Sequence, residues 1–190
     1  MNEKFPEIII EGYAGESGAR LIALGERARL ATRFRDDTID QICAGPYGGQ
    51  YVFHSDEERL MSMCDEHGAD VINLGDGGIL KGIYQEAVER KCGLKIYLSK
   101  VPILQSTIEI CEMFGLDPFR LFSYCHMIMC DNASTLCDKL TEAGYAASVV
   151  GYMQSSLDKV IADKEEIEYI NRPTRDEYLR YQDITYGRRK

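Results

Sequence analysis

Few basic residues, no long apolar run and no recognisable leader segment occur in this sequence. It has 22 Lys and Arg against 31 Asp and Glu, with a formal net charge of -9. A chain of this balance is a poor candidate for binding nucleic acid, which needs clustered cations. No apolar run reaches the length of a membrane-spanning helix, and residues 1–13 lack the basic and apolar regions of a signal peptide. We therefore expect a cytoplasmic protein that binds neither nucleic acid nor a membrane.

The sequence also lacks the spacings that would give its seven cysteines a chemical role. Their number is odd and no secretion signal accompanies them, which argues against a disulfide framework. There is no C-x-x-C and no histidine pair at metal-ligand spacing. The nearest approach is "CHMIMC", with Cys125, His126 and Cys130, in an apolar strand-like run where cysteine usually acts as a small hydrophobic residue. We predict no metal site and assign no catalytic residue, since no Ser-His-Asp or Cys-His arrangement is legible. The three histidines are expected at the surface.

Strand-like and helix-like segments alternate along the chain. The expected strands are 7–10, 69–74, 94–103, 120–131 and 146–153, with a hairpin over 156–171 that turns at Asp163 and Lys164. The expected helices are 19–34, 55–68, 79–91, 132–145 and a short one that starts at 105 and is closed by Gly115, and residues 172–184 form a helix or an extended arm. Because several strands look hairpin-connected, the pattern predicts an α/β (α+β) fold with a single mixed β-sheet layered with helices. No repeat or linker divides it, so we expect one domain over residues 1–190 with a core of about 7–180.

Turn and capping residues mark several boundaries between these segments. Ser55 and Glu58 have the spacing of a capping box at the start of the second helix. Gly68 is expected to end that helix, and Gly93 is expected in a left-handed cap after the third. Residues 44–51, "AGPYGGQY", are expected to form a loop.

Two glycine-rich turns share one order, in which glycines separate a buried strand from a helix. The first contains Gly12, Gly15 and Gly18, and the second is "GDGG", Gly75–Gly78. Helix N-termini present unpaired N–H groups and a partial positive charge, and glycine lets a ligand approach the backbone closely. A phosphate or another anion is therefore the natural ligand. Neither turn has the Walker or the G-x-G-x-x-G spacing, and such turns also occur for packing reasons alone.

The second turn adds an acidic side chain to its glycines. Asp76 could hold a cation or a ligand hydroxyl, although its ordinary role would be to cap the helix that follows. We expect the two turns to lie side by side at one edge of the sheet and to form an anion-accepting cleft.

Five segments in fixed order carry a resemblance to a known family. "IIIEGYAGESGARLIAL" resembles a strand, G-x-x-G-x-x-G, helix opening, and "ADVINLGDGGILKGIYQEA" resembles a segment with a D-P-T-x-G-G-L or D-I-S-D-G-L core. "VPILQSTIEICEMFGLDPFRLFS", "EAGYAASVVGYM" and "INRPTRDEYLRY" resemble the segments that follow. Together they are similar to the C-terminal domain of the aminoimidazole-ribonucleotide synthase superfamily, and most of all to its hydrogenase maturation branch. The superfamily also includes selenophosphate synthetase and thiamine-monophosphate kinase.

The resemblance implies a fold, a ligand class and a set of binding residues. The family's C-terminal domain is an α/β layer whose glycine-rich loops face a cleft where nucleotide and substrate phosphates bind. The positions that match those loops are Gly12, Gly15, Gly18, Gly75, Asp76, Gly77 and Gly78. The resemblance thus implies a small phosphorylated ligand.

Three departures from the family limit what the resemblance implies. Nothing corresponds to the family's N-terminal ATP-binding domain, which supplies metal-binding aspartates and the dimer barrel. The reactive terminal cysteine of the maturation branch has no counterpart, since no cysteine follows Cys137. Asn73 and Gly75 stand where that branch prefers Asp and Thr.

Two hypotheses follow, and a third is weaker. In the first, the chain binds a phosphate-bearing small molecule or completes a site with an ATP-binding partner chain, which would bring nucleotide and magnesium. In the second, it is a non-catalytic regulatory or assembly protein that kept the fold, and a homo-oligomer is an alternative to the partner chain. The third is an independent enzyme with a Cys or His nucleophile. We expect no useful ATP hydrolysis by the chain alone.

Overall fold

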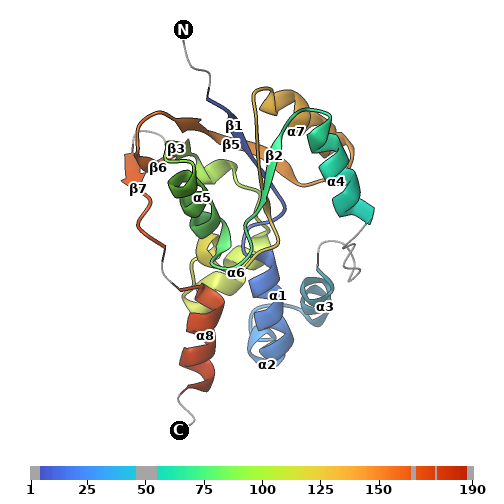
Figure 1. Cartoon of the computed structure of the whole chain (residues 1–190). Helices are drawn as coiled ribbons and strands as arrows, with labels where there is room; N and C mark the ends of the chain where they lie inside the picture. Colours follow the sequence, from blue (N-terminus) through green and yellow to red (C-terminus); the bar gives the residue numbers. More distant parts are fainter. Residues whose placement is uncertain (1–4, 46–54, 164–165, 174, 188–190) are drawn as a thin grey trace.

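A seven-stranded mixed sheet forms the centre of the computed structural model, which describes residues 5–45, 55–163, 166–173 and 175–187 (Figure 1). The strand order is β2-β4-β1-β5-β3-β6-β7. The only parallel pair recorded is β3 with β6, and the other recorded neighbours are antiparallel. The strands are β1 (Glu7–Glu11), β2 (Asp70–Asn73), β3 (Gly93–Ile96), β4 (His126–Cys130), β5 (Ala147–Gln154), β6 (Lys159–Asp163) and β7 (Glu166–Tyr169). The predicted mixed sheet with helical layers is confirmed.

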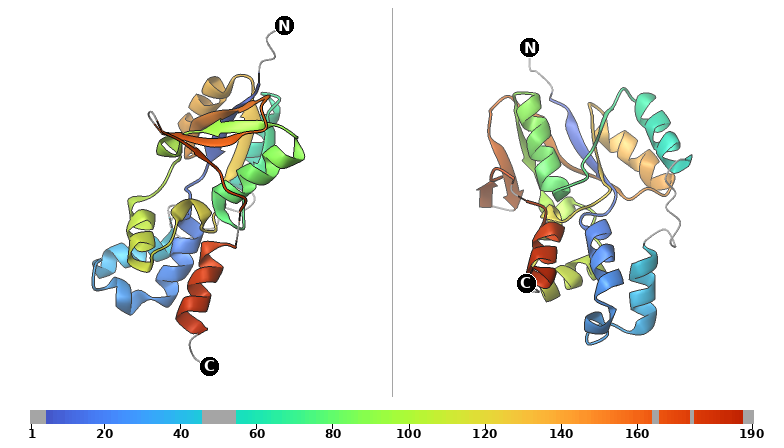
Figure 2. Two further views of the ribbon diagram at one scale, coloured as in Figure 1. Left: turned by 90° about the vertical axis from the view of Figure 1, so that its left-hand side faces the viewer. Right: turned by 60° about the horizontal axis from the view of Figure 1, so that its bottom comes forward.

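Helices cover both faces of the sheet and gather beyond one of its ends (Figures 1 and 2). The α-helices are α1 (Glu16–Gly25), α2 (Arg27–Leu30), α3 (Asp36–Ala44), α4 (Ser55–Asp65), α5 (Gly78–Glu89), α6 (Gln105–Phe114), α7 (Ala133–Glu142) and α8 (Glu177–Tyr186). Two 3-10 turns, η1 (Leu98–Lys100) and η2 (Pro118–Arg120), complete the elements. No helix in the described part of the chain is long and apolar enough to cross a bilayer.

Alternation along the central strands separates two cores. Ile8 and Ile10 pack with Ile83 of α5 on one face. Ile9 points the other way and packs with residues of α4 and α7. A third core lies beyond the sheet, where Ile22 of α1 and Tyr181 of α8 pack with α3 and α6. Each core consists of fully or almost fully buried apolar side chains, which is the main source of the fold's stability.

Several predicted boundaries were wrong for identifiable reasons. The helix predicted over 19–34 begins at Glu16 and breaks at Glu26, the residue that follows Gly25. The strand predicted over 94–103 ends at Ile96, where the chain enters η1 ahead of Pro102. The strand predicted over 120–131 starts only at His126, because Arg120 is the last residue of η2 and residues 121–125 are irregular.

Gly93 and residues 36–44 also differ from what the sequence predicts. Gly93 begins β3 instead of ending a helix, and the left-handed residue is Lys91, with a φ of 55°. A Cβ at Gly93 would lie 2.2 Å from the Asp158 carbonyl oxygen, so this glycine permits close strand packing. Helix α3 was missed altogether. The expected loop from 46 onward, Lys164 of the expected hairpin turn and the side chain of Ser55 lie outside the described residues.

Candidate functional site

Both glycine turns end a strand and begin a helix, as predicted. Gly15 precedes α1 with a φ of 67°, and Gly77 precedes α5 with a φ of 81°, both in the left-handed region that favours glycine. Strands β1 and β2 are each antiparallel to β4, which lies between them. They are therefore parallel to each other, and the two turns lie at the same end of the sheet.

The segment 118–125 packs against both turns. A Cβ added to Gly15 would lie 2.6 Å from the Pro118 carbonyl oxygen, and one added to Gly78 would lie 2.6 Å from that of Phe119. Gly12 and Gly18 approach the same segment farther along, at Tyr124 and Leu121. These four glycines are therefore required for packing against the chain itself, whatever else they do.

The first turn uses several of its backbone donors within the fold. Gly12 N–H donates to the Ala146 carbonyl at 2.8 Å, and Gly18 N–H donates to that of Phe122 at 2.9 Å. Between them, Ala14 N–H donates to Pro102 at 2.9 Å. Donors already bound to carbonyl oxygens offer little to an anion, so the first turn is the weaker candidate for ligand binding.

The second turn already holds a carboxylate. Gly77 N–H donates to Asp176 Oδ2 at 2.5 Å, and the other carboxylate oxygen accepts the Tyr178 N–H at 2.7 Å. Asp176 is buried, with 3% of its surface exposed. One negative charge therefore satisfies the N-termini of both α5 and α8, as expected where two helix dipoles converge.

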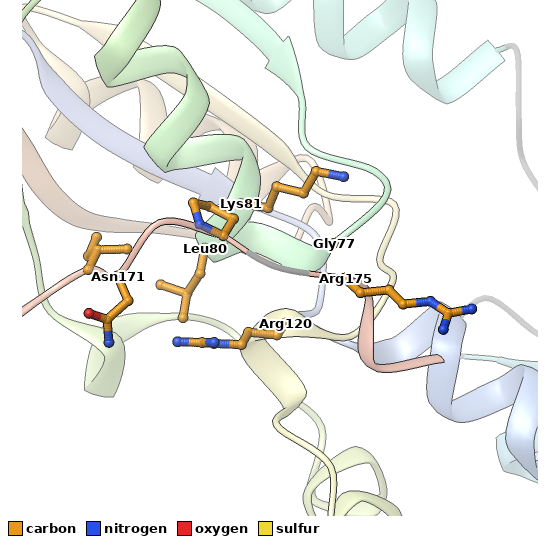
Figure 3. A pocket seen from close by; sticks show the side chains of 8 residues that line it. Gly77, Leu80, Lys81, Arg120, Asn171 and Arg175 are labelled. Carbon is orange, nitrogen blue, oxygen red and sulfur yellow. The ribbon is translucent and has the colours of Figure 1, made fainter. Parts of the chain in front are cut away.

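A small pocket opens beside this turn (Figure 3). Its lining combines cationic and amide side chains with an apolar wall, and consists of Gly77, Leu80, Lys81, Arg120, Ile170, Asn171, Pro173 and Arg175. In Figure 3 the Arg120 side chain extends toward Asn171, while Lys81 and Arg175 extend toward the opposite side. Three cationic side chains close to a helix N-terminus are surroundings that attract an anion such as a phosphate or carboxylate.

Each cation of the pocket also has an acidic neighbour. Lys81 Nζ lies 2.5 Å from Asp76 Oδ2, and Arg175 pairs with Asp183. Arg120 Nε is 3.2 Å from Asp117 Oδ2. That contact lacks hydrogen-bond geometry, since Arg120 Nε is a buried donor with no hydrogen-bond acceptor among the described residues. Of the three cations, Arg120 therefore has the most to gain from an added anion.

Of the predicted site residues, the structure brings only Gly77 into the lining of this pocket. Asp76 reaches it indirectly through Lys81, and Gly75 and Gly78 belong to the same turn but do not line the pocket. Gly12, Gly15 and Gly18 are not among the lining residues, so the cleft shared by both turns is not found there. Ligand binding by all seven residues stays a prediction.

Sequence reasoning missed Lys81, Arg120, Arg175 and Asp176. Lys81 follows Asp76 closely enough for its pairing to have been suspected. Asp176 had the signal of a helix cap, because an acidic residue opens "DEYLRY". No local motif around Arg120 or Arg175 indicates that either residue lies near the Gly77 turn in the folded chain.

Cysteine and histidine do not form the cluster suggested by "CHMIMC". Alternation in β4 places Cys125 in the core under α5, whereas His126 and Cys130 face α4 and α7. Within the part of the chain that the structure describes, no three His, Cys, Asp or Glu side chains are grouped to hold a metal. Burial raises the pKa of the Cys125 thiol, and likewise of Cys111, to about 12, so both stay protonated and unreactive. His126 is not a surface residue, since its side chain is 13% exposed.

Known proteins with similar sequences and folds include hydrogenase maturation proteins. A hydrogenase expression/formation protein of Methanocaldococcus jannaschii is 23% identical over 164 residues, which cover 82% of this chain and 44% of that protein. The structure of Escherichia coli HypE, a hydrogenase maturation protein, has a TM-score of 0.70 at 17% identity, with 94% of this chain and 53% of that chain covered. No family model matches the sequence.

A more distant fold relative comes from another branch. Thiamine monophosphate kinase of Aquifex aeolicus has a TM-score of 0.56 at 13% identity, covering 85% of this chain and 51% of that chain. The resemblance to the aminoimidazole-ribonucleotide synthase fold, and within it to the hydrogenase maturation branch, is confirmed. The chain spans about half the length of the relatives it matches.

Proposed function

We propose that this chain is a hydrogenase maturation factor-like protein that binds the phosphate group of a small molecule in the pocket beside Gly77. We further propose that an ATP-binding partner chain completes the site. The observation that carries the proposal is the pocket itself. It places Lys81, Arg120 and Arg175 at the N-terminus of α5, and Arg120 Nε is buried there without a hydrogen-bond acceptor among the described residues.

Two solved relatives of the same fold hold ATP or a second protein, which is what supports a partner. One solved relative is HypE in complex with ATP, with a TM-score of 0.69 at 14% identity, and this chain covers 53% of it. Another is a HypE–HypF complex, of which the chain covers 54%. This chain thus matches about half of each relative.

The pocket suits a phosphate better than a nucleotide with its magnesium. Mg²⁺ is usually held by carboxylates together with the nucleotide's phosphates. Asp76 is already paired with Lys81, and Asp176 accepts two backbone N–H groups. The purified chain alone is therefore expected not to hydrolyse ATP, with or without magnesium. Robust turnover that disappears in Asp76→Ala would make the chain an enzyme by itself.

A ligand screen tests the proposal directly. The purified chain is screened by thermal shift against nucleotides and phosphorylated metabolites, and hits are titrated calorimetrically. A ligand that binds only the folded state raises the melting temperature in proportion to the logarithm of its excess over Kd. Binding should weaken about tenfold or more in Arg120→Gln, since a charge-assisted hydrogen bond contributes roughly 1.5–3 kcal/mol.

Matched variants keep the screen interpretable. Lys91→Gln removes one exposed cation outside the pocket and should leave the affinity unchanged. If no phosphorylated compound binds, or if Arg120→Gln and Lys91→Gln bind equally well, the pocket is not the site. No observation on the described residues favours the alternative of a non-catalytic regulator.

A further inference from the structure

Three side chains lie in one row at the end of the sheet that carries both glycine turns. Glu11 ends β1, Asn73 ends β2, and each is the direct register partner of His126 at the start of β4. Directly opposed residues of antiparallel strands project from the same face, with Cβ atoms about 5 Å apart. Ile128, two residues after His126, packs in the core with α4 and α7. The row therefore faces α4, on the side of the sheet away from α5.

Glu11 fixes the orientation of the His126 ring. Its carboxylate is 7% exposed, and Oε2 lies 2.9 Å from His126 Nδ1. An ionised carboxylate can only accept, so Nδ1 carries a proton, and in the neutral ring that leaves the lone pair on Nε2. A carboxylate behind one ring nitrogen is the usual support of a histidine that binds a metal through the other.

Among Glu11, Asn73 and His126, the atom whose environment needs an explanation is His126 Nε2. It is buried and has no hydrogen-bond partner among the residues that the structure describes. Ordered water or an ion is a usual explanation for such an atom. The nearest recorded charge is Glu57 Oε1 of α4, 4.0 Å away, on a side chain that is 45% exposed.

The separation of these two groups suits a shared cation. Two tetrahedral ligands, each about 2.0 Å from one ion, lie about 3.3 Å apart. A shift of under about 1 Å by the exposed Glu57 side chain reaches that spacing. Asn73, the register partner of His126 on β2, carries an amide oxygen that lies near Gly75 and could turn to serve as a third donor.

We infer that His126 Nε2, the Glu57 carboxylate and the Asn73 amide oxygen bind one divalent transition-metal cation. Glu11 holds the imidazole in place and water completes the coordination. One nitrogen and two oxygen donors suit cations of the zinc, cobalt and manganese class. The cation would lie at the base of the second glycine turn, yet the inference does not depend on phosphate binding in the neighbouring pocket.

Cobalt titration of the reduced, metal-free chain tests the inference. Co²⁺ reports its ligands, because thiolate coordination adds intense charge-transfer bands that nitrogen and oxygen ligands do not give. The wild type should take up one Co²⁺ per chain without those bands. His126→Ala and His126→Gln should both abolish uptake, and Glu11→Gln should weaken it about 10- to 100-fold.

Two neighbouring variants serve as controls. Glu58→Gln removes the next acidic side chain of α4, and His67→Ala removes the histidine beyond the end of that helix. Both should bind Co²⁺ like the wild type, whereas Glu57→Gln and Asn73→Ala should bind it more weakly. Thermal melts establish that each variant is folded. Absence of uptake, thiolate bands, or uptake unchanged in both folded His126 variants would overturn the inference.

Discussion

Gly78 shows at the scale of one residue how tightly the second turn is packed. Its φ is +68°, and an added Cβ would lie 2.6 Å from the Phe119 carbonyl oxygen. Gly78→Ala should therefore lower the free energy of unfolding by about 2–4 kcal/mol, from backbone strain plus overpacking. Denaturant unfolding measures it.

Gly68 provides the matched control for that substitution. Its φ is +60°, and nothing lies within 4 Å of its added Cβ. Gly68→Ala should therefore lower the free energy of unfolding only by the cost of placing alanine in a left-handed conformation, about 1 kcal/mol. Equal losses in the two variants would mean that the contact with Phe119 is not a constraint.

Asp76 is predicted to oppose the ligand it stands beside. Its side chain is 65% exposed and neutralises Lys81, which lines the pocket. Asp76→Asn should free that ammonium and tighten phosphate binding by about two- to tenfold. Calorimetric titration measures the change. Asp70→Asn, which removes an equally exposed charge paired with Arg90, is the control and should have no effect. Weaker binding in Asp76→Asn would instead make Asp76 a ligand group.

Glu16, at the start of α1, gives stability a predictable pH dependence. Burial raises its pKa, against smaller lowering contributions from Ser17 and Arg20. The folded chain then holds this proton more tightly than the unfolded chain, so stability falls as pH rises from the ordinary glutamate value through the raised pKa. Glu16→Gln should remove that loss and raise the melting temperature at pH 7 by roughly 1–3 °C. If Glu16→Gln instead lowered the melting temperature at pH 7 and made stability depend more steeply on pH, the pKa of Glu16 would not be raised in the folded chain.

At the scale of elements, the strands and helices that flank the glycine turns could be predicted, because their apolar periodicity and their glycines indicate the same boundaries. Gly115 ends α6 in the left-handed conformation, as the sequence indicated. Helix α3 was missed because its "DDTIDQICA" buries only Ile39 and so carries little apolar periodicity. Hairpin connection was overestimated, since β6 with β7 is the one consecutive pair in the recorded strand order.

Asp176 is predicted to stabilise two elements at once. Asp176→Ala removes the cap of α8 and leaves the buried Gly77 N–H without its acceptor. The expected loss is about 1–3 kcal/mol in the free energy of unfolding. Asp183→Asn, on the exposed side of α8, should lose about 0.5 kcal/mol or less. Chemical denaturation compares the two, and similar losses would show that the shared cap adds nothing.

At the scale of the whole molecule, the candidate site is assembled from segments far apart in the sequence. The pocket joins the turn at Gly77 with Arg120 and with residues 170–175. Each segment's own pattern predicts its secondary structure, but not that the last strands and α8 return to this turn. The glycine turns were therefore recognisable from the sequence, while the cations and Asp176 required the three-dimensional arrangement.

The most direct test of the account is a phosphate titration followed by amide NMR. Inorganic phosphate added to the isotope-labelled chain should shift the signals of Gly77, Lys81, Arg120 and Asn171 in a saturable way. The amides of Gly12 and Gly18, which donate to carbonyl oxygens, should shift little. Saturable shifts confined to the first turn, or none at the pocket, would contradict the claim that the second turn and its cations form the anion site.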